Sequence, residues 1–490
     1  MPEQMVSPPI PSPQDTVAGQ KVRPPAVAGS FYPADAKILA AMIARMLSEV
    51  PSVALEGPVL ALLAPHAGYV YSGPVAAYSY ATLQGRKFKR VVVLAPSHYE
   101  SFSYSSIYDG DAYATPLGNL ALDHAFAQRL EQASASIRIS SHGHILNALG
   151  GEHAIEVQLP WLQQTLGDFQ LVPIVMGDHS YEASRALGVA LAAQMADGET
   201  LIVASSDLSH YHPYDEAVCM DRKSLDAFAA WDYFSMARNF EGRVWEACGG
   251  APIVATMIAA ERLGANRAQV LHYANSGDTA GSRSQVVGYG AAALLKGAAG
   301  AEGEEPFALS NADKAELLAL ARASVEHAVR EKQSYEPSAT ESGALQQERG
   351  AFVTLHKKGQ LRGCIGFTSA RKQLYLTVRD TALLAALRDP RFAPVAQAEL
   401  ADLDYEISVL SPLRKVLDVR RIGVGVHGLL VKRGNHEGLL LPQVPVEQGW
   451  DSETFLAHTC HKAGLPSDSW KDDETDIFSF TAVVFGEKEQ

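Results

Sequence analysis

Long hydrophobic runs, paired cysteines and an excess of positive charge are all absent from this sequence of 490 residues. Without an apolar run of about 18 residues, the chain has no candidate for a membrane-spanning helix. The four cysteines lie far apart and form no Cys-x-x-Cys pair, which argues against a disulfide scaffold or a zinc ribbon and favours a reducing cytoplasm. The net charge of −14 disfavours nucleic acid as a partner, because phosphate contacts need clustered Lys and Arg.

The remaining composition is that of a globular protein with two or three domains, since 47% of the residues are hydrophobic and 20% are charged. The first 20 residues contain five prolines and predict a flexible leader. A run rich in Gly, Ala and Glu, KGAAGAEGEEP at Lys296–Pro306, interrupts the hydrophobic pattern. We therefore expect a first domain over residues 21–298, a linker over 299–306 and a second domain over 307–488.

In the first expected domain, short continuous apolar runs alternate with segments of helical periodicity. Continuous apolar strands joined by helices indicate an α/β sheet with both faces covered. The expected strands are Val59–Leu63, Val91–Ala95, Leu171–Met176, Leu201–Ser205 and Gln285–Tyr289, and the expected helices are Ala36–Ser48, Val75–Leu83, Glu152–Leu166, Ser180–Met195, Asp221–Arg238 and Pro252–Leu263.

The second expected domain mixes hairpins with helices, which is typical of an α+β fold. Ser310 is placed to cap a helix, and the runs Lys-Lys-Gly and Arg-Gly-Asn mark two hairpin turns. The first hairpin is expected in AFVTLHKKGQLRGCIGF and the second over Leu429–Leu441. The expected helices are Asn311–Arg330, Lys372–Arg388 and Ser452–Lys462, and the other expected strands are Asp404–Leu410 and Ile477–Phe485.

Polar side chains follow three of the expected strands in the first domain. His66 follows one in LLAPHAGY, His98 follows the next in VLAPSHY, and Asp207 and His210 follow a third in VASSDLSHY. Because α/β sheets bind ligands at the carboxyl ends of their strands, we expect these side chains to converge on one site. Imidazole and carboxylate groups are the usual ligands of iron, copper and zinc. A single histidine after a strand is more often a loop residue than a metal ligand, so the prediction of a metal site depends on the recurrence of such residues after three strands.

Cys248 is the expected third metal ligand. It lies in WEACGGAPIVA, just before a helix expected to begin near Pro252. The dipole and unpaired N–H groups of the first helical turn favour the thiolate, and Gly249 and Gly250 permit close approach of another surface. The alternative is a small buried hydrophobic side chain, the commoner role of an unpaired cysteine.

In EHAIEVQLPWL, His153 and Glu156 are three residues apart and would share one face of a helix. They would supply an acid–base pair or support a metal ligand through hydrogen bonds. A surface contact between the two side chains at the start of the helix is the alternative.

In the second expected domain, LRGCIGF places Arg362 close to Cys364 within a β-patterned hairpin. An arginine beside an exposed thiol would lower the pKa of the thiol and favour a catalytic role for the pair. Arg388 and Arg391 of RDPRF would complete an anion pocket with Arg362. The alternative is a structural hairpin, kinked by glycine, around a buried cysteine.

Residues 21–298 resemble the Memo family through RPPAVAGSFYPAD, LAPHAGYVYSGPVAA, LAPSHY, EHAIEVQLPWL, SSDLSHY and ACGGAPI. The resemblance implies an α/β fold like that of class III extradiol dioxygenases. It also implies that His66, His98 and Cys248 face a metal ion, with Asp207 and His210 beside them. Extradiol dioxygenases hold Fe(II) with two histidines and one carboxylate. A thiolate in the third position favours iron or copper redox chemistry, with zinc as a further metal that such donors accept.

Residues 307–488 resemble the AMMECR-like domain through GAFVTLHKKGQLRGCIGF, LRDPRFAPV and DYEISVLSP. The two families and a radical S-adenosylmethionine protein form the AmmeMemoRadiSam system, and the chain resembles a fusion of its B and A proteins. The sequence contains no CxxxCxxC cluster motif, so the radical enzyme itself would be a separate partner.

Together these observations predict a cytoplasmic, metal-dependent oxidoreductase that acts on a small molecule or a peptide. One alternative is a module that binds a ligand or peptide without turnover. Another is an accessory protein that positions a substrate for a radical S-adenosylmethionine partner. Neither nucleic acid nor a membrane is an expected partner.

Overall fold

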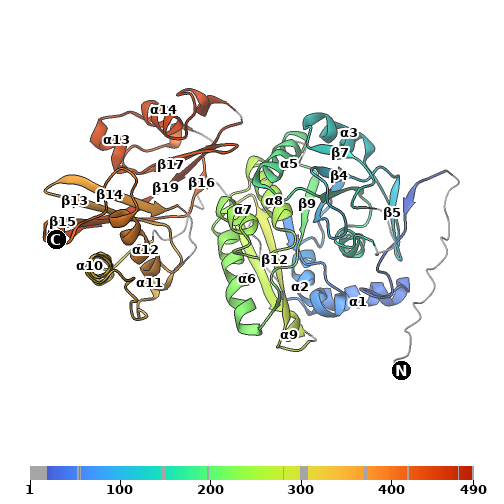
Figure 1. Ribbon diagram of the computed structural model, residues 1–490. Helices are drawn as coiled ribbons and strands as arrows, with labels where there is room; N and C mark the ends of the chain where they lie inside the picture. Colours follow the sequence, from blue (N-terminus) through green and yellow to red (C-terminus); the bar gives the residue numbers. More distant parts are fainter. Residues whose placement is uncertain are drawn as a thin grey trace. The chain divides into compact units, whose positions relative to one another are not determined.

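The computed structural model describes residues 19–51, 55, 57–144, 151–195, 198–279, 281–297, 307–368, 372–416, 419–472 and 474–487. The chain divides into two compact units between residues 301 and 302 (Figure 1). Of the expected leader over residues 1–20, only the last two residues are described, and the expected linker over 299–306 lies outside the described residues. Within the described ranges, no helix combines the length and the apolar character needed to cross a membrane.

A nine-stranded mixed sheet forms the centre of the first unit, in the order β10-β12-β2-β9-β3-β8-β4-β7 with β11 beside β12. Its central strands are parallel, as continuous apolar strands joined by helices predict. A separate three-stranded sheet has the order β1-β5-β6. The strands are β1 (Val22–Arg23), β2 (Val59–Ala64), β3 (Arg90–Pro96), β4 (Ser105–Ile107), β5 (Ala112–Thr115), β6 (Gly118–Ala121), β7 (Ile137–Ile139), β8 (Gln170–Met176), β9 (Thr200–Ser205), β10 (His210–His212), β11 (Arg267–Asn275) and β12 (Val286–Leu295).

Helices cover both faces of the nine-stranded sheet. On one face, alternate strand residues such as Leu62 and Ala64 share a buried core with α1, α2 and α4. On the other face, α8 contacts β2, β3 and β9 and packs on α5. The contact between the two helices is close enough to require glycine at position 188, since a Cβ at Gly188 would lie 2.7 Å from the Ala255 carbonyl oxygen. The helices are α1 (Ala36–Glu49), α2 (Tyr69–Ala81), α3 (His124–Ala133), α4 (Leu159–Leu166), α5 (Tyr181–Gln194), α6 (Tyr214–Ala229), α7 (Tyr233–Glu241), α8 (Gly250–Arg262) and α9 (Ser276–Thr279).

Three helices of the first unit differ from the expected ones. The helix expected over Val75–Leu83 is α2, which begins six residues earlier, at Tyr69, and contains Pro74. The helix expected over Asp221–Arg238 is in fact α6 and α7, separated at Trp231, which adopts a left-handed φ of 59° and buries its ring. The Asp232 side chain then accepts a hydrogen bond from the Ser235 N–H and begins α7. The helix expected from Glu152 begins only at Leu159, after a short 3₁₀ turn, because the Pro at its second position fits only a first turn.

The second unit contains two antiparallel four-stranded sheets, in the orders β14-β13-β15-β20 and β16-β19-β17-β18. Both predicted hairpin turns are confirmed, as is the helix cap at Ser310, which forms a capping box with Asp313. The strands are β13 (Ala351–Lys357), β14 (Gln360–Phe367), β15 (Leu403–Leu410), β16 (Arg414–Lys415), β17 (Gly428–Arg433), β18 (His436–Leu440), β19 (Asp476–Phe480) and β20 (Ala482–Gly486), and the helices are α10 (Asn311–Glu331), α11 (Gly343–Gln346), α12 (Leu374–Leu387), α13 (Gln443–Gln448) and α14 (Ser452–Lys462).

The single strand expected over Ile477–Phe485 is wrong. The segment forms β19 and β20, which belong to different sheets and meet at Thr481. The N–H of Thr481 donates to Ser411 Oγ, and its carbonyl accepts from the Ser411 N–H. These bonds satisfy the backbone where the chain leaves one sheet and enters the other.

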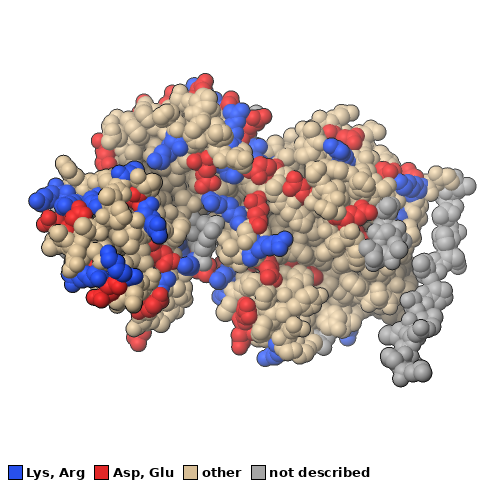
Figure 2. All heavy atoms as spheres, viewed as in Figure 1, with Lys and Arg blue, Asp and Glu red and all other residues tan. Residues whose placement is uncertain are grey.

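Acidic and basic side chains intermingle on the surface. On the face that Figure 2 shows, Lys and Arg lie among Asp and Glu over each unit. Several of these charges are paired, such as Arg433 with Asp472 and Glu474, each at 2.8 Å. This interspersion accords with 41 basic and 55 acidic residues in the sequence.

Candidate metal centre

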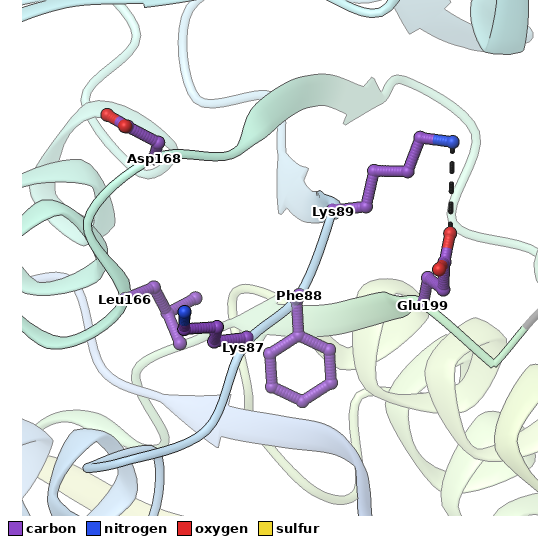
Figure 3. Close-up of a pocket in the computed structure, with 6 residues that line it drawn as sticks. All are labelled: Lys87, Phe88, Lys89, Leu166, Asp168 and Glu199. Carbon is purple, nitrogen blue, oxygen red and sulfur yellow. Dashed lines mark ion pairs between the residues drawn. The ribbon is translucent and has the colours of Figure 1, made fainter.

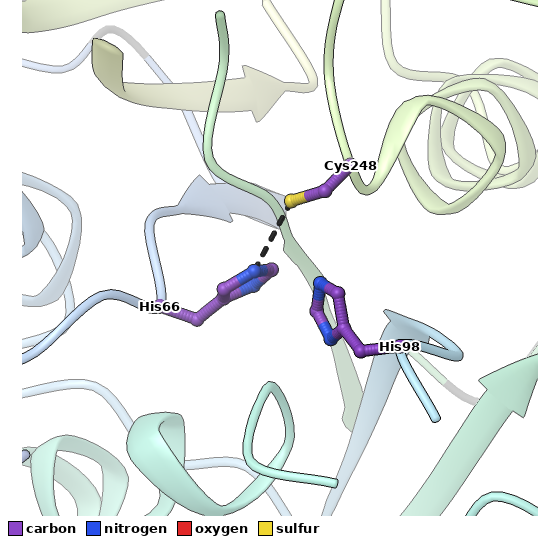
Figure 4. A group of neighbouring side chains, drawn as sticks. All are labelled: His66, His98 and Cys248. Atoms are coloured by element: carbon purple, nitrogen blue, oxygen red, sulfur yellow. Dashed lines mark hydrogen bonds between the residues drawn. The ribbon is translucent and has the colours of Figure 1, made fainter. Parts of the chain in front are cut away.

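Three neighbouring strands of the nine-stranded sheet end at the candidate site. β2, β9 and β3 are parallel, and His66, Asp207 and His98 follow their carboxyl ends. Cys248 comes from the turn before α8, and its Sγ lies 3.1 Å from Nε2 of His66. The ligand atoms of His66, His98 and Cys248 all lie within 4.8 Å of one another (Figure 4). The fold therefore gathers the two imidazoles and the thiol at one point.

Glycine brings the Cys248 turn against the end of β9. A Cβ at Gly249 would lie 2.3 Å from the carbonyl oxygen of Ser205, a distance that non-bonded atoms do not reach. The Gly249 N–H donates to Ser206 Oγ at 2.9 Å, and the Asp207 N–H donates to Cys248 Sγ at 3.2 Å. The close approach predicted from the Gly-Gly pair is thus what places the sulfur.

The end of β9 and the loop that follows it hold His66, which lies in the loop after β2, from two sides. The His66 N–H donates to Asp207 Oδ1 at 2.8 Å, and ring atom Nδ1 lies 2.9 Å from Ser205 Oγ. The side chain is buried, with Nε2 turned toward Cys248 (Figure 4). The ring is therefore oriented before any ligand binds.

Glu152 is a site residue that reasoning from the sequence missed. Its carboxylate accepts from the His98 N–H at 2.7 Å and lies 2.9 Å from His98 Nδ1. It also accepts from the N–H groups of His153 and Ala154, each at 2.9 Å. A carboxylate bound to one imidazole nitrogen is the usual support of a metal-ligating histidine, and it leaves Nε2 free. The signal in the sequence was an acidic residue directly before a histidine within an apolar segment.

Burial and mutual charge set the protonation of these groups. Burial lowers the pKa of His66 well below its ordinary value, and His98 adds to that effect. Burial alone would raise the pKa of Glu152, but the hydrogen bond from His98 and the charges of His98 and His153 lower it to about 2. For His98, burial is outweighed by Glu152, which raises the pKa. Glu152 is therefore ionised at neutral pH and accepts the Nδ1 proton of His98.

The predicted lowering of the Cys248 pKa by the helix is wrong. Burial raises the pKa of this thiol, and the Asp207 carboxylate raises it further, outweighing the hydrogen bonds from the backbone. A cation among these donors would reverse the balance, because a bound metal replaces the thiol proton. Two imidazole nitrogens and one sulfur form a donor set that iron, copper and zinc accept, so the residues present fit a transition metal.

His153 lies beside the donor group. Its ring stacks on His98 with centroids 4.9 Å apart, and it meets His66 edge-on at 5.5 Å. Its Nδ1 is buried without a hydrogen-bond partner among the described residues, and the nearest carboxylate oxygen, on Glu152, is 3.8 Å away. Burial lowers the pKa of His153 to about 4, so the ring is neutral at pH 7.

Glu156 does not form the expected pair with His153. Its carboxylate accepts from Arg23 at 2.8 Å, from the Tyr32 hydroxyl at 2.6 Å and from two backbone N–H groups of the intervening segment. The 3₁₀ turn at this position directs Glu156 to the N-terminal segment instead. This buried carboxylate anchors residues 23–32 to the sheet domain.

Asp207 and His210 border the donor group from the loop after β9. Asp207 Oδ2 lies 3.9 Å from His66 Nε2, and burial raises the pKa of this carboxyl. The His210 N–H donates to Glu246 at 3.2 Å, and its ring interacts electrostatically with Asp207 and His66. Both lie where the sequence pattern placed them, next to the three donors but outside their group.

In the second unit, Cys364 lies on β14 with its backbone bound to the RDPRF segment. Its N–H donates to Asp389 at 2.9 Å, and its carbonyl accepts from Arg391 at 3.2 Å. Its Sγ accepts from Thr354 Oγ1 at 3.2 Å. Burial raises the pKa of this thiol despite the opposing charge of Arg391, so the predicted lowering of its pKa is wrong.

The arginines near Cys364 already face carboxylates. Arg362 binds Glu399 through two nitrogens at 3.1 and 3.0 Å, and Arg391 binds Asp389 at 2.9 and 2.7 Å. Such forked pairs fix the orientation of the guanidinium, although Glu399 also accepts from Lys357 at 2.8 Å and is thus shared between two cations. Two of the three arginines of the expected anion pocket, Arg362 and Arg391, are therefore paired with carboxylates, while Nη1 of Arg362 is buried without a hydrogen-bond partner among the described residues.

A cavity of about 400 Å³ lies at the opposite end of the nine-stranded sheet (Figure 3). Its lining residues all precede the amino ends of β3, β8 and β9, and Lys89 faces Glu199 across it at 3.8 Å. Because the donor group lies at the carboxyl ends of these strands, this cavity does not belong to the candidate metal centre. It is lined by Lys87, Phe88, Lys89, Leu166, Asp168 and Glu199.

Comparison with known proteins assigns both units to families. Residues 23–293 match the family described as Memo-like protein, and residues 318–485 match AMMECR1. A MEMO1 family protein of Methanopyrus kandleri is 38% identical over 287 residues, which cover 56% of this chain and 99% of that protein. A protein of Thermococcus onnurineus is 44% identical over 182 residues, covering 35% of this chain and 89% of the relative. The crystal structure of an uncharacterized protein from Pyrococcus horikoshii is 42% identical, with a TM-score of 0.35, covering 35% of this chain and 90% of that one.

The first of these matches spans more than half of the chain, and it includes every residue of the candidate metal centre. Memo family membership supports an extradiol dioxygenase-like fold for this unit. The second match lies within the second compact unit, so the two families are fused in one polypeptide. The chain therefore belongs to the Memo-like protein family and carries an AMMECR1 domain after its Memo-like domain.

Proposed function

We propose that the Memo-like domain is a metal-dependent oxidoreductase in which His66, His98 and Cys248 hold iron or copper. The observation that carries the proposal is that the ligand atoms of these three side chains lie within 4.8 Å of one another, although they come from three separate segments. Hydrogen bonds to the Nδ1 atoms of both rings leave the Nε2 atoms for a metal.

The site's own residues support redox chemistry on a small molecule or a peptide. A bound iron or copper ion would supply one-electron chemistry and an open position for a substrate atom. Cys248 would supply negative charge, and His153 would hold or accept a proton at Nδ1, which lacks a hydrogen-bond partner among the described residues. Asp207, beside His66, would hold a second proton. Two exposed tyrosines, Tyr99 with its ring 6.5 Å from that of His153 and Tyr211 with its ring 5.9 Å from that of His210, offer contacts for the substrate.

The test is metal analysis of the full chain, purified without chelator or an affinity-column metal. We expect close to one equivalent of iron or copper per chain, together with oxygen uptake when small redox-active substrates are added. The His98→Ala variant should lose both, because only His66 and Cys248 remain as ligands. Native protein that neither contains nor takes up iron or copper, while remaining folded, would refute the proposal.

The alternative is a ligand- or peptide-binding accessory protein for a radical S-adenosylmethionine partner. The exposed tyrosines favour it, since Tyr211 is 69% exposed and Tyr99 is 40% exposed beside the site. Exposed aromatic side chains are common anchors of a docked partner. Co-purification with such a partner, together with metal binding but no oxygen uptake, would favour this alternative over the oxidoreductase.

A further inference from the structure

Two neutral polar side chains, Ser205 and Gln158, are buried beneath His66, and both are inaccessible to solvent. Ser205 Oγ lies 2.9 Å from His66 Nδ1, and Gln158 Nε2 donates to Ser205 Oγ at 2.7 Å. Neither side chain belongs to the donor group. Their contacts nevertheless determine where the proton of the His66 ring resides.

The orientation of the Gln158 amide follows from its neighbours. Its Nε2 lies 3.0 Å from the carbonyl oxygen of Pro65 and 3.3 Å from that of Ala64. Carbonyl oxygens only accept hydrogen bonds, so the amide must present its NH₂ group to them and to Ser205. Its Oε1 then accepts from the Tyr80 hydroxyl at 2.6 Å. All polar atoms of the amide are thereby satisfied.

The Ser205 hydroxyl has one proton and two lone pairs. Its proton goes to the Ala154 carbonyl oxygen at 2.6 Å, because that oxygen cannot donate. One lone pair accepts from Gln158, which leaves only a lone pair for His66. His66 Nδ1 must therefore carry a proton, and in a neutral ring Nε2 is the bare nitrogen that faces Cys248.

We propose that Ser205 and Gln158 are positioning residues that lock His66 in the tautomer with the proton on Nδ1. The effect of this tautomer on metal binding rests on the proposed function, whereas the assignment of the tautomer rests on the hydrogen bonds alone. The two histidines of the site are then oriented by different means, His98 by the Glu152 carboxylate and His66 by a neutral hydroxyl.

The experiment is ¹H–¹⁵N NMR of the histidine rings in the metal-free full chain, followed by titration with Zn²⁺ as a probe. We expect His66, identified by the loss of its signals in His66→Gln, to be protonated at Nδ1 alone. Ser205→Ala should give a mixture of tautomers and weaken Zn²⁺ binding about 10–100-fold. The matched control is Ser79→Ala, which removes an equally buried serine that donates only to the Leu63 carbonyl at 2.6 Å. The control should change neither the tautomer of His66 nor the affinity for Zn²⁺.

The wild-type spectrum tests the tautomer without any variant, so a misfolded Ser205→Ala protein would not end the test. A His66 ring protonated at Nε2 in the metal-free wild type would overturn the proposal. An unchanged tautomer and an unchanged Zn²⁺ affinity in folded Ser205→Ala would also overturn it. Wild-type protein with the predicted tautomer but no affinity for any transition metal would instead refute the proposed function alone.

Discussion

Cys248 in the Memo-like domain and Cys364 in the AMMECR1 domain adjoin glycines that allow an equally close backbone contact. A Cβ at Gly249 would lie 2.3 Å from the Ser205 carbonyl oxygen, and one at Gly363 would lie 2.2 Å from that of Ala385. The sulfur of Cys248 nevertheless meets an imidazole at 3.1 Å, whereas that of Cys364 meets the Thr354 hydroxyl. A glycine beside a cysteine therefore reports close packing and does not by itself indicate chemistry.

The polar groups around the two cysteines differ in the same way. Near Cys364, Arg362 and Arg391 each face a carboxylate, and the partner of Arg362, Glu399, is shared with Lys357. Near Cys248, both histidines are supported through Nδ1, and Nε2 of His66 lies 3.1 Å from the Cys248 sulfur and 3.9 Å from Asp207 Oδ2. The two clusters therefore differ in composition, because opposite charges pair near Cys364, whereas possible metal-ligating atoms lie within 4.8 Å of one another near Cys248.

The largest expected difference between the two cysteines is in metal binding. Cys248→Ala should lose the bound iron or copper, with a fall in affinity of more than about 100-fold, because two neutral imidazoles alone hold such an ion weakly. Cys364→Ala, the matched control, should keep the wild-type metal content. Elemental analysis of both variants checks this. Equal metal loss from both would end the distinction drawn between the two cysteines.

The close packing at the two glycines should be equally important. Gly249→Ala and Gly363→Ala should each destabilise their own domain by about 3 kcal/mol, because the added methyl group would overlap a backbone carbonyl. Gly343→Ala is the control, since a Cβ there would meet nothing within 4 Å. Thermal unfolding followed by calorimetry measures each transition. A melting profile of Gly249→Ala like that of the control would contradict the packing argument.

Thiol reactivity should separate Cys364 from an ordinary surface cysteine. Because burial raises its pKa, Cys364 should react with iodoacetamide at pH 8 about tenfold more slowly than the exposed Cys219. Mass spectrometry of tryptic peptides gives both rates in one sample, and a sample in denaturant gives the intrinsic rates. Faster alkylation of Cys364 than of Cys219 in the folded protein would restore the catalytic interpretation of the Arg362–Cys364 pair.

The smallest expected effect concerns the ion pair of Arg362. The hydrogen bond from Arg362, with those from Ala396 and Lys357, lowers the pKa of Glu399 to about 2 from an ordinary value of 4.5. The carboxylate thus stabilises the folded state fully above pH 4.5, and the stabilisation disappears as the pH falls through 2. Glu399→Gln should lower the free energy of unfolding by about 1 kcal/mol at pH 7.

The difference between Glu399→Gln and wild type should shrink as the pH falls below 4.5, which denaturant unfolding at several pH values measures. A gap that is constant with pH would mean that the charge of Glu399 is not the source of its effect. No difference at any pH would leave Arg362 free to serve an anion, and the comparison with the Memo-like domain would then need revision.

Much of the fold was accessible from the sequence because local patterns and tertiary packing agree. The apolar runs that became β2, β3, β8 and β9 are buried at nearly every position, so their hydrophobicity reports their environment directly. Where the expectation was wrong, packing overrode the pattern. The break at Trp231 and the sheet change at Thr481 both occur within sequences that read as continuous helix or strand.

By itself, the sequence determined that His66, His98 and Asp207 follow strand ends, because an apolar run followed by a polar residue specifies that position in an α/β sheet. Only the tertiary structure decided which groups support them. Glu152 and Ser205 reach the two histidines, and Gln158 reaches Ser205, from segments up to 139 residues away along the chain, and the local sequence does not specify the partner in such contacts. The tertiary structure also decided that Glu156 holds the N-terminal segment and that Arg362 forms an ion pair with Glu399. Side-chain partners depend on the packed arrangement of distant segments, whereas strand ends depend on the hydrophobic pattern alone.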